Sequence, residues 1–131
     1  MPKSIFLLFS HKLTQKQESE LKSEGISRFV YLPGELQTLW SNVPADIDDV
    51  SIYISPVLGW LKNNARIGDW VLVQGDFGAC CLVVDFCFGN DLIPVYATTR
   101  RIVEEAIEGD GVVKISKFIH ERFRKYRRWR I

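Results

Sequence analysis

The sequence predicts an α/β fold with a doubly wound, mostly parallel sheet and a C-terminal β-hairpin. Short apolar runs of strand length alternate with amphipathic segments of helical length over the first 97 residues. The central apolar run, residues 70–73, leads through a glycine-containing turn into an apolar segment of helical length at 79–88. Beyond residue 100 apolar and polar residues alternate on both sides of Gly109-Asp110-Gly111, which is typical of a hairpin.

The first half of the chain carries clear start and stop signals. An apolar run predicts the first strand at residues 5–9. Thr14 begins a helix, because Gln17 three residues later completes a capping box, and Gly25 ends this helix in the C′ position. A second short strand follows at residues 29–32, and the apolar spacing at 35–40 indicates one or two helical turns.

The second half is less regular. Residues 43–55 fit either a helix start or a strand, and Pro56 is then predicted to begin a helix that runs to residue 65. The next strand is predicted at residues 93–97, where Pro94 favours an edge position or the first residues of the strand. Residues 101–107 and 112–123 form the predicted hairpin arms, although residues 104–106 suit a helix equally well.

Composition indicates one globular domain over residues 1–131. Hydrophobic residues make up 47% of the chain and charged residues 25%, both ordinary values. No apolar run reaches transmembrane length, and the first residues lack the pattern of a cleavable leader, so we expect a cytoplasmic protein without a membrane partner. Cys80, Cys81 and Cys87 share one apolar segment, which favours buried small side chains over disulfides, metal ligands or a nucleophile.

Charge is distributed unevenly although the formal net charge is only +1. Residues 116–131 carry seven cations and one acid, whereas the preceding residues carry ten cations and fifteen acids. This basic tail suits a polyanionic partner or an acidic face of another subunit. It equally suits a solvated arm.

Polar side chains follow three predicted strands at the points where those strands end. Because ligands bind beyond the carboxyl ends of parallel strands, these residues are the candidate site. Hydroxyl, amide, guanidinium and glycine N–H groups are donors that suit phosphate oxygens and the edges of a base or ribose. The candidates are Ser10, His11, Gln74, Gly75, Asp76, Gly78, Thr98, Thr99 and Arg100.

The same residues limit the chemistry. The turn at residues 74–78 is neither G-x-G-x-x-G nor a P-loop with its lysine. Asp76 is its one acid, and no His, Cys and Asp cluster has metal-ligand spacing, so we expect neither a metal-dependent hydrolase nor a cofactor. Asp76 could be a helix N-cap, and His11 could be either a proton shuttle or a hydrogen-bonded structural residue.

Four segments carry a resemblance to a known family: residues 7–15, 68–79, 94–100 and 118–126. Their most specific strings are Val-Gln-Gly-Asp at 73–76 and Val-Tyr-Ala-Thr-Thr-Arg at 95–100. In these segments the chain resembles the small stand-alone CRISPR-associated ring nucleases. The resemblance implies a Rossmann-like, CARF-like domain that forms a homodimer. It also implies an enzyme that cleaves cyclic oligoadenylate, most often cyclic tetra-adenylate, and so switches off type III CRISPR signalling.

The resemblance also implies a reaction that needs no metal. A ribose 2′-OH of the ring attacks the adjacent phosphate, so the protein chiefly orients the ring and stabilises charge on phosphorus. Arg100, Thr99 and His11 are then the catalytic candidates, and the other strand-end residues bind substrate. Two facing copies of the candidate site are expected to hold one ring. A non-catalytic cyclic-nucleotide sensor and an RNA-binding module using the tail from Arg122 to Arg130 stay open as alternatives.

Overall fold

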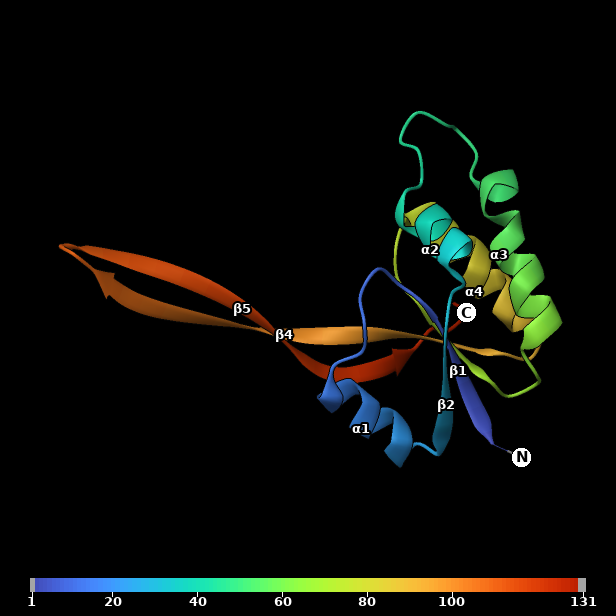
Figure 1. Ribbon diagram of the computed structural model, residues 1–131, viewed down its shortest axis with the longest axis horizontal. Helices are drawn as coiled ribbons and strands as arrows, with labels where there is room; N and C mark the ends of the chain where they lie inside the picture. The colour runs from blue at the N-terminus through green and yellow to red at the C-terminus, as the bar shows by residue number, and fades with distance from the viewer. Residues whose placement is uncertain (1, 130–131) are drawn as a thin grey trace.

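The computed structural model describes residues 2–129 as a mixed α/β domain with one five-stranded sheet and four helices (Figure 1). The strand order is β2-β1-β3-β4-β5, in which the first four strands are parallel and β5 is antiparallel to β4. The strands are β1 Lys3–Leu8, β2 Ile26–Tyr31, β3 Trp70–Val73, β4 Ile93–Glu108 and β5 Gly111–Lys125. The helices are α1 Gln15–Ser23, α2 Gly34–Ser41, α3 Ser51–Asn64 and α4 Phe77–Gly89.

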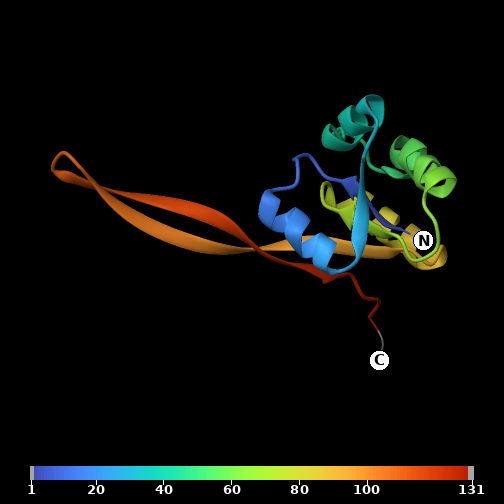
Figure 2. The ribbon, with the colours of Figure 1, turned by 60° about the horizontal axis from the view of Figure 1, so that its bottom comes forward.

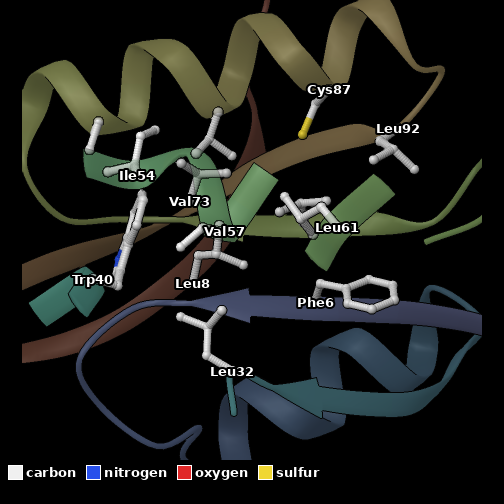
Figure 3. Close-up of a cluster of buried hydrophobic side chains, with 13 residues drawn as sticks. Phe6, Leu8, Leu32, Trp40, Ile54, Val57, Leu61, Val73, Cys87 and Leu92 are labelled. Atoms are coloured by element: carbon white, nitrogen blue, oxygen red, sulfur yellow. The ribbon is translucent and has the colours of Figure 1, made fainter. Parts of the chain in front are cut away.

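Helices cover both faces of the sheet. α1 packs on one face, where Leu21 joins Ile5, Leu7 and Leu72 in a buried cluster. The other three helices pack on the opposite face, where Trp40, Ile54, Val57 and Cys87 surround Phe6, Leu8 and Val73 (Figure 3). Side chains alternate across a strand, so the unbroken apolar runs of β1 and β3 supply both clusters.

The predicted boundaries of α1 are confirmed. Thr14 is the N-cap, with its Oγ1 accepting from the Gln17 N–H while the Gln17 side chain accepts from the Thr14 N–H. Gly25 follows the helix with φ of +86°, a conformation that glycine adopts without a steric penalty. Local side-chain chemistry is therefore enough to set both ends of this helix.

Pro56 does not begin α3, contrary to the prediction. The helix starts at Ser51, whose N–H and hydroxyl both donate to Asp49 Oδ1 at 2.8 and 2.7 Å. These two bonds lower the pKa of Asp49. Pro56 has no N–H for the carbonyl of Ile52, but the Ser55 hydroxyl donates to that carbonyl at 2.8 Å. The helix thus continues through the proline.

The hairpin is confirmed and is longer than predicted. β4 runs without a break from Ile93 to Glu108, so residues 98–100, expected after a strand end, lie within the strand. Pro94 is the second residue of β4. Proline has no N–H to donate to a neighbouring strand, which favours a position near the start of a strand. Beyond residue 98 the hairpin leaves the domain and projects into solvent (Figures 1 and 2).

The cysteine prediction is correct in part. Cys87 is buried and Cys80 is half-buried, but Cys81 is exposed on α4. Burial raises the pKa of the Cys87 thiol to about 12. In the part of the chain that the structure describes, no helix has the length and apolar character needed to cross a membrane.

Candidate functional site

The candidate site lies where β1 and β3 end side by side. Leu8 pairs with Val73, and the next N–H, that of Gln74, donates to the Leu8 carbonyl at 3.0 Å. From this point the chain leaves β1 toward β2 on one side and leaves β3 toward β4 on the other. Connections that diverge in this way leave a crevice at the carboxyl ends of the strands, where open α/β sheets bind ligands.

The turn between β3 and α4 is built tightly against Trp40. The Trp40 Nε1 donates to the Gln74 carbonyl at 2.9 Å, and a Cβ on Gly75 would lie 3.0 Å from that same nitrogen. Asp76 is the N-cap of α4, with Oδ2 accepting from the Ala79 N–H at 3.0 Å. Asp76 is therefore a helix N-cap, which was one of the two roles predicted for it, the other being substrate binding. Gly75 has no side chain, which lets the turn pack closely on Trp40.

Gln74 joins this turn to the hairpin. Its side-chain Oε1 accepts from the Ala97 N–H at 2.8 Å, two residues beyond the last backbone pair between β3 and β4. The side chain thus continues the strand pairing after β3 has ended. This contact gives Gln74 a structural role at the position where substrate binding was predicted.

Ser10 and His11 stand at the end of β1. The Ser10 Oγ lies 3.1 Å from the Ser41 Oγ of α2, and the Gln37 side chain donates to both the Phe9 carbonyl and Ser41 Oγ at 2.9 Å. His11 is exposed, with its ring 6.3 Å from that of Phe9. Both residues are exposed directly after the carboxyl end of β1, so both are accessible to a ligand.

Thr98, Thr99 and Arg100 lie where β4 leaves the sheet. The Thr98 hydroxyl donates to the Arg122 carbonyl at 2.9 Å, beside a bulge between Thr98 and Thr99. The Arg100 Nε is 3.8 Å from a Glu121 carboxylate oxygen, and Arg100 is exposed. At ~3.4 Å per residue, Arg100 is about 10 Å further along the strand than Ala97.

The fold therefore gathers only part of the predicted set. Residues 10, 74–78 and 98 lie toward the same edge of the sheet, because β1, β3 and β4 are neighbours in parallel register and Gln74 bonds to Ala97. Thr99 and Arg100 lie on the projecting hairpin instead. Their contact with a ligand in the crevice requires a ligand that extends along β4.

A hollow lined by aromatic side chains adjoins the edge and was not predicted. Its volume is about 420 Å³, within the ~300–1,000 Å³ of small-molecule sites. Phe77 at the start of α4 is 91% exposed, and the rings of Tyr96 and Tyr126 are 4.7 Å apart. The lining residues are Gln74, Gly75, Phe77, Cys80, Cys81, Val84, Tyr96 and Tyr126.

Two groups in the hollow stay protonated near neutral pH. Burial is the main cause that raises the pKa of the Cys80 thiol to about 11, and the negative charge of Asp76 adds to it. The Cys80 thiol is therefore a poor nucleophile. Burial also raises the pKa of Tyr126 to about 12, and its hydroxyl donates to the Val73 carbonyl at 2.8 Å. Phe77 was the one available sequence signal, since it is an apolar residue inside a polar turn.

His120, the second histidine, belongs to the packing of α1 against β5. Its Nε2 is 2.6 Å from Glu20 Oε1, and Glu20 Oε2 accepts from the Phe123 N–H at 2.8 Å. The basic tail begins in this region. Arg130, which the sequence assigns to that tail, lies outside the described residues.

The comparisons with known proteins cover nearly the whole chain. A protein of Methanocaldococcus jannaschii with the description "Uncharacterized protein MJ1673" is 48% identical over 127 residues, which are 96% of this chain and 98% of that protein. No solved structure matches this chain. The model of the "Uncharacterized protein MJ1673 family" matches residues 3–124, so the chain belongs to the MJ1673 family.

Proposed function

We propose that this protein binds cyclic oligoadenylate, with cyclic tetra-adenylate as the preferred ring, at the carboxyl edge of the sheet and cleaves it. The observation that carries the proposal is the aromatic hollow, whose lining includes Gln74 and Gly75 of the turn after β3. A purine base stacks on aromatic rings, and its phosphate and ribose need donors a few ångströms away. The resemblance in residues 73–76 and 95–100 falls on these same elements.

Phe77 and Tyr96 are the base-stacking groups in this proposal. Phe77 is largely exposed, so a base that covers it removes apolar surface from water. Tyr96 is held in place by its contact with Tyr126 and by the Arg124 guanidinium, which donates to the Tyr96 hydroxyl at 3.1 Å. The hollow would therefore receive the adenine with little rearrangement.

Ser10, Gly78 and Thr99 supply hydroxyl or N–H donors for phosphate and ribose, and Thr98 contributes only after its hydroxyl releases the Arg122 carbonyl. The Asp76 carboxylate accepts the hydrogen bond of the Ala79 N–H, so a phosphate would bind to other N–H groups of the turn. Arg100 has a fork of donors suited to the charge that develops on phosphorus. His11 is the candidate that accepts or donates a proton, because its exposed imidazole follows the carboxyl end of β1.

The reaction proposed is an internal transfer within the ring. The ribose 2′-oxygen bonds to the adjacent phosphorus and loses its proton, the bond from phosphorus to the 5′-oxygen breaks, and that oxygen gains a proton. The product is a linear oligoadenylate with a 2′,3′-cyclic phosphate and a 5′-OH. The nucleophile belongs to the substrate, so the protein contributes orientation and charge stabilisation.

A finer statement about the fold forms part of the proposal. We infer a Rossmann-like, doubly wound domain, since the order β2-β1-β3-β4 and the helices on both faces support it. The antiparallel β5 and its long hairpin depart from that pattern.

Incubation of radiolabelled cyclic tetra-adenylate with the full chain in excess EDTA tests the function. We expect conversion to a linear product, separated from the ring by chromatography, that carries a cyclic phosphate end. Binding without cleavage would identify a sensor instead. Absence of both binding and cleavage, or cleavage only after Mg²⁺ is added, would contradict the proposal or its metal-independent chemistry.

RNA binding by the C-terminal arm is a second candidate. Trp129 is exposed, and the Arg128 guanidinium lies 4.9 Å from the centre of the Phe88 ring. Cations interleaved with aromatic rings suit a single strand of RNA. A gel shift with linear RNA, compared between the full chain and Arg127→Ala/Arg128→Ala, tests this role separately from ring cleavage.

A further inference from the structure

The projecting hairpin exposes apolar side chains on a segment that has no second layer to pack against. Ile107 is 85% exposed and Phe118 is 68% exposed, and Val103, Val112, Val113 and Ile115 are exposed as well. A two-stranded hairpin in water is marginally stable without such a layer. Exposed apolar surface on a regular, extended element is typical of an interaction site.

The hairpin also has an open hydrogen-bonding edge. The backbone pairs between β3 and β4 end at Val95, and Ala97 is the last residue that bonds to the β3 side, through Gln74. From Thr98 to Glu108, β4 is paired with β5 alone within residues 2–129. This edge is ~35 Å long, and every second residue directs its N–H and C=O toward it.

The charges along β4 are complementary to those of a second β4 strand that runs antiparallel to it. Arg100 is ion-paired with Glu121 of its own hairpin and Glu104 with Lys117, at 3.8 and 3.1 Å. Among the described residues Arg101 and Glu105 are in no ion pair, although Arg101 donates to the Ser116 hydroxyl at 3.2 and 3.1 Å and Glu105 lies opposite Lys114. Both lie on the same face as Val103. An antiparallel copy centred on Val103 places each Arg101 opposite the partner's Glu105.

The outer edge of β5 suits a reversed copy of itself less well, because its one acid, Glu121, is already ion-paired with Arg100. β5 contains five lysines and arginines and one acid, Glu121. An antiparallel copy centred on Phe118 would place Lys114 opposite Arg122 of the partner subunit, and like charges directly opposite each other destabilise a sheet. At its inner end that edge is also covered by α1, through the Glu20 carboxylate.

We propose that two copies of this chain associate through their hairpins, with β4 paired antiparallel to β4 of the partner around a two-fold axis at Val103. The two hairpins form a four-stranded sheet in the order β5-β4-β4-β5. The two-fold axis makes Arg101 and Glu105 form two equivalent pairs, and it brings the two Val103 side chains together. The open edge of β4 is then filled on both subunits.

This register also brings each tip to the partner's candidate site. Residue 109 of the partner subunit lies across from Ala97, whose N–H is bonded to Gln74. The tip therefore reaches the end of β3, and the two candidate sites stand ~40 Å apart. The association does not depend on the identity of the ligand, but it predicts one ring per subunit rather than one ring shared by facing sites.

Sedimentation equilibrium of the full chain at micromolar concentration tests the association without any ligand. We expect a reversible dimer, at twice the 15.1 kDa of one chain. Glu105→Arg should raise the dissociation constant by roughly tenfold or more, because two attractive pairs become repulsive. Arg101→Glu combined with Glu105→Arg should restore the wild-type value. Asp46→Arg, the same charge change in a loop outside the hairpin, should leave it unchanged.

Cysteine cross-linking tests the register. In a Cys81→Ser background, Val103→Cys should oxidise to a covalent dimer, because the two side chains meet at the axis. Ile107→Cys should not, because its two copies would be ~27 Å apart. A monomer in sedimentation would overturn the proposal. A dimer without the Val103→Cys cross-link, or one insensitive to Glu105→Arg, would equally overturn it.

Discussion

Gln74 and Ala97 are joined by a 2.8 Å hydrogen bond from a backbone N–H to a side-chain amide oxygen. The bond connects the turn after β3 to the residue at which β4 leaves the domain. Removing the acceptor leaves a half-buried N–H without its partner, which typically costs ~1–3 kcal/mol. We therefore expect Gln74→Ala to lower the free energy of unfolding in urea by that amount. Gln74→Glu, which keeps an oxygen acceptor, should stay closer to the wild type; equal losses would show that the bond contributes nothing.

Gly75 packs against the buried indole of Trp40. A Cβ at position 75 would lie 3.0 and 3.1 Å from two atoms of that ring, which is itself fixed by its bond to the Gln74 carbonyl. Gly75→Ala should therefore destabilise the protein by ~1–3 kcal/mol, measured by chemical denaturation.

Gly59 in α3 provides the matched control. A Cβ there meets no atom within 4 Å, and alanine is the better helix former. Gly59→Ala should stabilise the protein by ~0.5–1 kcal/mol. The same sign of change at both positions would contradict the packing assigned to Gly75.

Arg100 is the residue on which the proposed cleavage depends most. Arg100→Ala should lower the single-turnover rate on cyclic tetra-adenylate by about ten- to a thousandfold, the range for loss of one donor to a transition state. Arg28 on β2 is exposed and lies at the far edge of the sheet, so Arg28→Ala should leave the rate unchanged. An unchanged rate for Arg100→Ala, with the fold intact, would show that the reactive centre does not include Arg100.

The three thiols should differ in reactivity toward iodoacetamide. The pKa of Cys80 is raised to about 11 and that of Cys87 to about 12, so at pH 8 their thiolate fractions are on the order of 0.1% or less. Cys81 is exposed. Peptide mass spectrometry over time should find Cys81 modified about tenfold faster than the other two, and raising the pH to 9 should accelerate Cys80. Equal rates at Cys80 and Cys81 would contradict the burial of Cys80.

Local signals in the sequence were sufficient where the responsible side chain acts on its neighbours. Thr14 and Gln17 cap α1, Gly25 ends it, and the run at 70–73 forms a strand buried on both faces. The position of the candidate edge followed from the same signals, because parallel strands end together. Each of these predictions needed only residues within one turn or one strand.

The remaining features depend on contacts that no short pattern encodes. Pro56 continues α3 because the Ser55 hydroxyl bonds to the carbonyl that proline leaves free. The hollow depends on Tyr126, which bonds to Val73 across 53 positions of sequence. The sequence predicted separate segments at 93–97 and 101–107 because residues 98–100 are polar and interrupt the apolar pattern, whereas the structure has one strand from Ile93 to Glu108.

β4 is a single strand of 16 residues that belongs partly to the core and partly to the hairpin. Its first residues are clamped between β3 and β5, and its last residues are more than 30 Å away at ~3.4 Å per residue. A force on the outer half of this strand would therefore act on the hydrogen bond between Gln74 and Ala97. A molecule that binds the hairpin tip and displaces it would shift the end of β3, where α4 and the aromatic hollow begin.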